Sequence, residues 1–302
     1  MTGADIADRS VRLGVIPKAN SRDRAFSFFF RLLMFGALFL AFLALVTLLY
    51  DVARDGVPKL SSDFLTRFPS RILPQRSGIE SALLGTLWLM VICATMVVPL
   101  GIATAVYLEE YADRKRWYNR LLEVNIQNLA AVPSVVYGIL GLAFIVRGPL
   151  SLGRTVLAGG ITLGLLVLPV VIIVSREAIR AVPSSIRDGS LALGATQWQT
   201  IWKQVLPGSI AGIATGVILA LSRAIGETAP LLVIGAGVSL RFNPDGLGSA
   251  FTALPIQIFA WSTDANTEFV DLAAAAIIVL MIGLLLMNSV AIFLRNRYEQ
   301  RW

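Results

Sequence analysis

The sequence predicts an all-α integral membrane protein with six transmembrane helices. Of the 302 residues, 56% are hydrophobic and only 15% are charged, and the mean hydropathy is +0.73. A soluble domain carries about 25% charged residues, so this chain lacks the polar surface that a water-soluble globule needs. Its long apolar stretches also lack the alternation of polar and apolar residues that is typical of barrel strands.

Six stretches are long enough to cross a bilayer, which requires about 20 apolar residues in a helix. The predicted spans are about 32–50, 82–107, 124–146, 155–175, 209–235 and 272–294. They form a six-helix transmembrane domain over 32–294, between an N-terminal tail (1–31) and a C-terminal tail (295–302). Because the first span is longer than the apolar core of a cleaved signal peptide, we expect it to be retained.

The distribution of Lys and Arg predicts the orientation of these spans. Seventeen of the 26 basic residues lie in segments on the same side as the termini, eight lie on the other side, and Arg223 lies within a span. Cytoplasmic loops carry the excess of basic residues, so we expect a plasma (inner) membrane protein with both termini in the cytoplasm. The net charge of +7 is then mainly a topology signal rather than a sign of nucleic-acid binding.

The composition excludes several kinds of chemistry. The chain has no His and a single Cys, Cys93, so it cannot form a Ser-His-Asp triad, a His-ligated metal site, an intramolecular disulfide or a thiolate zinc cluster. It also has no Gly-Lys-Ser or Gly-Lys-Thr sequence and therefore no P-loop for ATP. We expect no catalytic residue, no metal and no cofactor in this chain, and no ATP hydrolysis by it alone.

The cytoplasmic loop 176–208 predicts a helix, a turn and a second helix. Pro183 and Ser184 are typical of a helix start, and Gly194 ends the first helix. Thr196 is placed to cap a second helix, which we expect to end before Pro207. The loop carries apolar residues, so it either packs on its own bundle or docks a cytoplasmic partner. On the opposite side, residues 250–261 are too short to span and predict a short helix that either dips into the outer membrane interface or lines the mouth of a cavity.

Five segments carry a family resemblance. Residues 188–207 resemble the EAA loop of ABC-transporter permeases: Asp188, Gly194, Leu206 and Pro207 fit, whereas Gly189, Ser190 and Gln204 depart from the usual residues. The segments 107–112, 128–138, 223–230 and 253–258 resemble the phosphate-specific ABC permeases. Leu-Glu-Glu-Tyr at 108–111 and Leu-Pro-Ile-Gln-Ile at 254–258 resemble the A-type subunit of that family rather than its C-type partner.

The resemblance implies a type I importer permease (MetI-like) architecture and an importer of inorganic phosphate. The implied partners are a second, C-type permease subunit, an ABC ATPase homodimer that binds ATP and Mg, and an extracytoplasmic phosphate-binding protein. The loop residues expected to contact or shape the ATPase groove are Asp188, Leu191, Gly194, Ala195, Leu206 and Pro207.

The candidate substrate path centres on Arg223 and Glu227, which are four residues apart and therefore share one face of a helix. An arginine at the bilayer centre costs about 2.5–3.5 kcal/mol, and an exposed i,i+4 pair returns only about 0.2–0.5 kcal/mol. The pair should therefore face protein or a hydrated cavity. It either holds the bundle together or offers Arg223 to a passing oxyanion. Gln127 and Asn128 either line the same path or pair with a neighbouring helix.

Three other functions remain open from the residues themselves. A permease for sulfate, molybdate or tungstate would need the same kind of oxyanion path. An ion-coupled secondary transporter would be expected to show repeated halves, and an ion channel a filter loop or charged ring; neither feature is evident.

Overall fold

The computed structural model describes residues 21–113 and 115–298, and the regular secondary structure in these ranges is helical. The long helices are α2 (Ser21–Gly56), α4 (Glu80–Val106), α5 (Trp117–Ala130), α7 (Val156–Arg180), α10 (Leu206–Ile225) and α13 (Thr267–Tyr298). The shorter α-helices are α3 (Ser62–Thr66), α6 (Ser134–Leu140), α8 (Ser184–Ala192), α9 (Gln197–Thr200), α11 (Ala229–Ile234) and α12 (Leu254–Ser262). Three π-helical segments are η3 (Tyr107–Tyr111), η4 (Gly141–Val146) and η5 (Ile201–Val205), and two 3-10 turns are η1 (Val57–Lys59) and η2 (Pro74–Arg76). The outer parts of the two predicted tails, 1–20 and 299–302, lie outside the described residues.

The third apolar stretch differs from the single helix expected over 124–146. Among the residues that the structure describes, five helices are long and apolar enough to cross a membrane, and a sixth span results when the pair 117–130 and 134–146, bent by 105°, counts as one. Pro133 lies at the bend, where its missing N–H and its effect on the preceding residue oppose a continuous helix. The Tyr137 hydroxyl donates to the Leu129 carbonyl across the bend at 2.8 Å. The predicted count of six is thus reached with one broken span.

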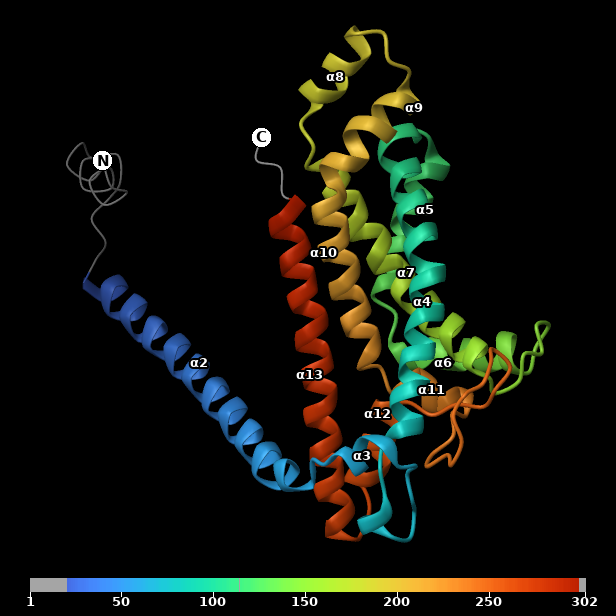
Figure 1. The fold of residues 1–302 in the computed structure, drawn as a ribbon. Coiled ribbons are helices and arrows are strands. Elements are labelled where there is room, and N and C mark those ends of the chain that lie inside the picture. The colour runs from blue at the N-terminus through green and yellow to red at the C-terminus, as the bar shows by residue number, and fades with distance from the viewer. Residues whose placement is uncertain (1–20, 114, 299–302) are drawn as a thin grey trace. The chain divides into compact units, whose positions relative to one another are not determined.

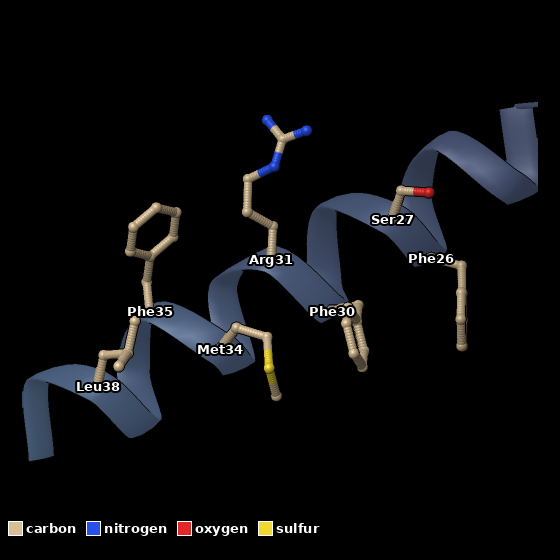
Figure 2. Close-up of a pocket in the computed structure, with 7 residues that line it drawn as sticks. All are labelled: Phe26, Ser27, Phe30, Arg31, Met34, Phe35 and Leu38. Carbon is tan, nitrogen blue, oxygen red and sulfur yellow. The ribbon is translucent and has the colours of Figure 1, made fainter. Parts of the chain in front are cut away.

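The chain forms two compact units, Met1–Val52 and Ala53–Trp302. Most of α2 belongs to the first unit, and its apolar side chains are exposed along its length. Figure 2 shows a shallow hollow on α2 that is lined by five of these apolar side chains together with Ser27 and Arg31. All seven come from one helix, so this hollow is a gap between neighbouring side chains rather than a site built by several elements. A helix that is apolar on all sides is typical of contact with lipid or with another chain.

In the second unit, α7 forms the centre of the bundle. Helices α4 and α10 both pack along α7, and α13 packs against α10. A Cβ atom at Gly212 would lie 2.8 Å from the Ala178 Cβ, and one at Gly216 would lie 2.7 Å from the Val174 Cβ. These two glycines therefore allow α10 to approach α7 closely, as the small-xxx-small pattern predicts.

The two ends of this unit carry different structures. Figure 1 shows α8 and α9 at one end and α3 and α12 at the other. Helix α12 confirms the short helix that the sequence predicts within residues 250–261. Its Ile256 and Gln257 side chains are fully buried, and Trp261 packs with Phe64 and Phe269 in a small apolar cluster.

Candidate functional site

Arg223 lies in the last turn of α10, immediately before a break in the predicted fifth span. The helix ends at Ile225, and α11 begins only at Ala229. Pro230 has no N–H, so a continuous helix here would lose the bond to the Gly226 carbonyl, whereas Pro is tolerated in the first turn of a new helix. The span expected over 209–235 is therefore two helices, and Glu227 does not lie on α10.

Arg223 and Glu227 nevertheless form an ion pair. The Arg223 Nε lies 3.6 Å from the Glu227 Oε1, and the two side chains are 62% and 17% exposed in the single chain. The Glu227 N–H donates to the Ala224 carbonyl, so the turn after α10 returns the carboxylate to the arginine. An ion pair this exposed contributes about 0–1 kcal/mol. Most of the Arg223 side chain is thus uncovered in the single chain.

A small hollow lies between Arg223 and the bend of the third span. It is lined by Leu129, Ala130, Val132, Ser134, Leu166, Val167, Val170, Ala220 and Arg223. These residues come from the α5–α6 bend, α7 and α10, so three parts of the bundle meet at this point. Arg223 is the only charged residue among the nine. Apart from Ser134 and Arg223 the lining side chains are apolar, and in the single chain the hollow has a volume of about 10 Å³, which is room for about one water molecule.

Gln127 and Asn128 lie in the last turn of α5, just before the bend, and both are exposed. Their side chains are not among those that line the hollow. Within the described residues, no hydrogen bond joins either side chain to Arg223 or Glu227. The structure thus brings Arg223 to the α5–α6 bend but does not bring these two polar side chains to Arg223.

At the other functional segment, local chemistry determines the turn between α8 and α9. Helix α8 starts at Ser184, and Gly194 follows it with φ +87°, a conformation that favours glycine. The Gly194 N–H donates to the Leu191 carbonyl and the Ala195 N–H to the Ser190 carbonyl, which is the Schellman pattern. Thr196 then begins α9 through reciprocal bonds with Gln199, a capping box.

The predicted coupling residues of this loop are largely accessible. Asp188, Leu191 and Gly194 are exposed, and Ala195 is half-buried. Helix α8 buries none of its residues, and the Leu193 side chain that follows it is 91% exposed. A cleft between α8 and the α9–η5 segment is lined by residues of both. The loop therefore presents an apolar, uncovered surface at this end of the chain.

The second loop helix does not end before Pro207, and this expectation is wrong. Helix α9 continues through η5 into α10, so one uninterrupted helical segment runs from Gln197 to Ile225. The Leu206 N–H bonds to the Ile201 carbonyl five residues back, and this wider π turn admits Pro207, whose ring would clash in a regular α-helix. Leu206 and Pro207 thus lie within the span helix, half-buried and exposed respectively.

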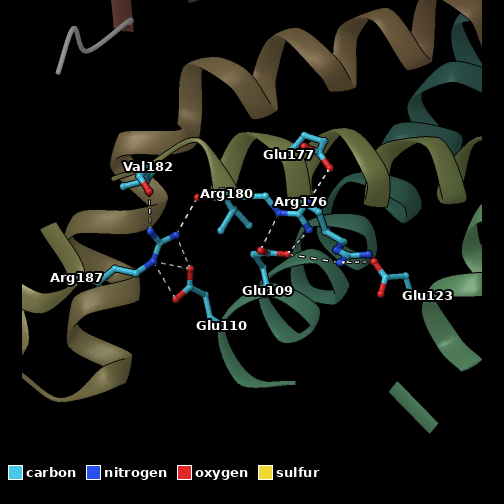
Figure 3. A network of polar contacts seen from close by, with 9 residues as sticks. Glu109, Glu110, Glu123, Arg176, Glu177, Arg180, Val182 and Arg187 are labelled. Atoms are coloured by element: carbon cyan, nitrogen blue, oxygen red, sulfur yellow. Dashed lines mark hydrogen bonds and ion pairs between the residues drawn. The ribbon is translucent and has the colours of Figure 1, made fainter. Parts of the chain in front are cut away.

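A network of carboxylates and arginines, which the sequence reasoning missed, lies beside this loop (Figure 3). Arg176 bonds to Glu123 at 2.9 Å and to Glu109 at 3.5 Å, and Arg180 bonds to Glu109 at 3.0 Å. The Arg187 Nη2 on α8 bonds to the Glu110 Oε1 at 2.8 Å. The positions of the charged residues could have indicated this network. Glu109 and Glu110 follow one predicted span, and Arg176 and Arg180 follow another that ends on the same predicted side of the membrane.

These features define a class: a multi-pass membrane permease with a cationic hollow within its bundle and an uncovered loop at one end. Residues 97–302 match the family described as "Binding-protein-dependent transport system inner membrane component", and the chain belongs to this family. This family consists of membrane permeases, which are components of transport systems.

Curated relatives agree with this assignment. The chain is 33% identical to the phosphate transport system permease protein PstA of Mycobacterium leprae, over 97% of both chains. It is 31% identical to PstA of Yersinia pestis, over 84% of this chain and 85% of the relative. It is 26% identical to the phosphate transport system permease protein PstC of Xylella fastidiosa, over 94% of this chain and 98% of the relative. The resemblance to A-type phosphate permeases is thus confirmed.

Solved structures confirm the predicted architecture. One similar structure is a bacterial alginate ABC transporter in complex with an alginate pentasaccharide-bound periplasmic protein. The match covers 89% of this chain and 93% of the transporter chain, with a TM-score of 0.61 and 18% sequence identity. The inward-facing MetNI methionine ABC transporter matches 74% and 95%, with a TM-score of 0.57 and 17% identity. At these identities the similarity concerns the fold alone.

Proposed function

We propose that this chain is the A-type permease subunit of an ATP-driven importer that moves inorganic phosphate into the cytoplasm. The observation that carries the proposal is the full-length similarity to phosphate permeases, together with Arg223 as the one charged group in the hollow. A guanidinium offers a planar set of donors that suits a phosphate oxyanion. Its weak, exposed pairing with Glu227 leaves it available for a substrate that must also be released.

The energy source in this proposal is a partner. A second, C-type permease would complete the path, an extracytoplasmic phosphate-binding protein would deliver the substrate, and an ABC ATPase homodimer would bind ATP and Mg. The basic segments and both termini face the cytoplasm in this arrangement. The exposed residues Asp188, Leu191 and Gly194, with Ala195, would contact the ATPase. Leu206 and Pro207 would connect this contact to Arg223, because all three lie on the Gln197–Ile225 helical segment.

Reconstitution tests the proposal directly. The chain is co-expressed with its partner subunits, purified as a complex and placed in liposomes with ATP inside and the binding protein outside. We expect ATP-dependent uptake of labelled phosphate that excess sulfate or molybdate does not inhibit. If sulfate or molybdate inhibits the uptake, the inhibiting anion is favoured as the substrate. Phosphate uptake that does not depend on ATP would refute the assignment to ATP-driven importers.

Variants at Arg223 test its role in the path. We expect Arg223→Ala to assemble normally and to abolish uptake, because the hollow then has no charged donor. Arg223→Lys, which keeps the charge but loses the planar set of donors, should retain only part of the uptake. Normal uptake by an assembled Arg223→Ala complex would refute the assigned role.

A further inference from the structure

Two side chains of the coupling loop bond to one residue of the bundle, Glu110, which lies in the π-helical extension of α4. The Arg187 Nη2 and Nε lie 2.8 Å and 3.0 Å from the Glu110 Oε1. From α9, the Gln197 Nε2 donates to the Glu110 backbone carbonyl at 2.6 Å. Both helices of the loop therefore bond to the same residue of the bundle. We call these three residues the Glu110 clamp.

Arg187 also joins the loop to the end of α7. Its Nη1 donates to the Val182 carbonyl at 2.6 Å, and its Nη2 donates to the Ile179 carbonyl at 2.9 Å. Figure 3 shows the guanidinium between Glu110 and the Val182 carbonyl. One side chain thus links α8, the end of α7 and the end of α4.

The Glu110–Arg187 pair of the clamp is largely shielded from water, whereas Gln197 and most of the loop are exposed. The Glu110 side chain is 9% exposed and the Arg187 side chain is 21% exposed. Helix α8, which carries Arg187, has no fully buried residue. Charge-assisted hydrogen bonds are strengthened in such surroundings, and a buried carboxylate that loses its partner is strongly destabilised. Because α8 has no buried apolar face, polar bonds rather than apolar packing fix its position on the bundle.

The neighbouring pairs in Figure 3 do not have this role. Arg180 bonds to Glu109 and Glu177, and Arg176 bonds to Glu109 and Glu123. These pairs join α4, α5 and α7 to one another without contacting α8. They are equally charged and lie close to the clamp, so they provide a matched control.

We propose that the Glu110 clamp is the joint through which displacement of α8 reaches α4 and α7, with Arg187 and Glu110 as its positioning residues. The proposal rests on the proposed function, in which an ATPase displaces α8. The continuous Gln197–Ile225 segment connects the loop to α10, and the clamp adds connections to two further helices. Without the clamp, α8 moves with the ATPase while α4 does not follow.

The first test measures coupling in the reconstituted complex. In Arg187→Gln and Glu110→Gln complexes, ATPase activity stimulated by the binding protein should persist, while the amount of phosphate transported per ATP should fall severalfold. The double variant should be no worse than either single variant, because the two residues act as one unit. Arg180→Gln should keep the wild-type ratio, since Glu109 retains Arg176.

Several results would overturn the proposal. One is an unchanged ratio in Arg187→Gln, and another is an equal loss in Arg180→Gln. Additive losses in the double variant would also do so. If Arg187→Gln does not assemble, Arg187→Lys serves instead: it can keep one ion pair to Glu110 but cannot also reach both carbonyls, so an intermediate ratio is expected and a wild-type ratio contradicts the clamp.

A second measurement is independent of the substrate. Spin labels at Leu193→Cys and Tyr111→Cys, both exposed positions, report the distance from the loop to the end of α4 in the assembled complex, and the native Cys93 is buried. The distance distribution should be narrow in the wild type and broad in Arg187→Gln. If the distance distributions of the wild type and Arg187→Gln are equally wide, the clamp is refuted, whether or not the complex transports phosphate. If the distributions differ as expected but the complex takes up no phosphate, only the proposed function is refuted.

Discussion

Gly194 is the position at which a single methyl group should disturb the coupling loop without disturbing packing. A Cβ atom built at Gly194 meets no heavy atom within 4 Å, so substitution causes no steric clash within the chain. The strain arises from the backbone, because φ is +87° and an L-residue in the left-handed region costs about 1–2 kcal/mol. A difference of this size changes an equilibrium by a factor of about 5–30.

Gly194→Ala should therefore shift the turn between α8 and α9 without unfolding the protein. In reconstituted complexes we expect phosphate transported per ATP to fall severalfold while assembly is unchanged. Gly194→Asn should lose less, because Asn tolerates the left-handed region better than other non-glycine residues. Gly194→Leu should resemble Gly194→Ala if strain alone acts, and a greater loss would indicate that the partner surface fits closely at this point.

Gly189 supplies the matched control. It lies within α8, also with nothing within 4 Å of a built Cβ, but with ordinary helical geometry. Gly189→Ala should stabilise the helix by about 0.5–1 kcal/mol and leave coupling intact. The reasoning fails if Gly194→Ala couples as well as Gly189→Ala, or if Gly194→Asn is as impaired as Gly194→Leu.

Three further predictions concern the bundle and the loop. Gly85→Ala should prevent stable assembly, measured as complex yield and melting temperature, because its Cβ would lie 2.0 Å from the Thr252 carbonyl oxygen; an unchanged melting temperature would contradict this packing. Thr196→Ala should destabilise the start of α9 by about 0.5–2 kcal/mol and lower the coupling ratio, whereas Thr196→Ser should restore it. Cys93 is fully buried, so maleimide labelling of the folded complex should be negligible and should appear only on denaturation.

The sequence was sufficient where short-range chemistry determines the structure. The apolar stretches predict the membrane helices, and Ser184, Gly194 and Thr196 predict the start of α8, its end and the start of α9. Each of these features depends on residues within about one helical turn. For the same reason the cap of α9 could be predicted before any tertiary contact was known.

Features that depend on tertiary contacts could not be predicted in the same way. Pro133 indicates a possible kink, but the 105° bend also involves the bond from Tyr137 to Leu129 and the packing of α6 on α11. Pro207 suggests a helix end, yet a π turn admits it within a longer helix. The Glu110 clamp joins segments about 77 residues apart in sequence, so spacing alone gives no sign of it.

In the proposed transport path, the energetics of Arg223 favour completion of the path by a second subunit. An arginine at the bilayer centre costs about 2.5–3.5 kcal/mol, and its exposed pair with Glu227 returns about 0–1 kcal/mol. The other eight residues around the hollow carry no charge, and only Ser134 among them has a polar side chain. Since 62% of the Arg223 side chain is uncovered, the missing stabilisation has to come from water, from a substrate anion or from a second subunit facing it. This deficit supports the proposed pairing with a C-type permease. It also predicts that partner carboxylates or hydroxyls near Arg223, once located, will be as sensitive to substitution as Arg223 itself.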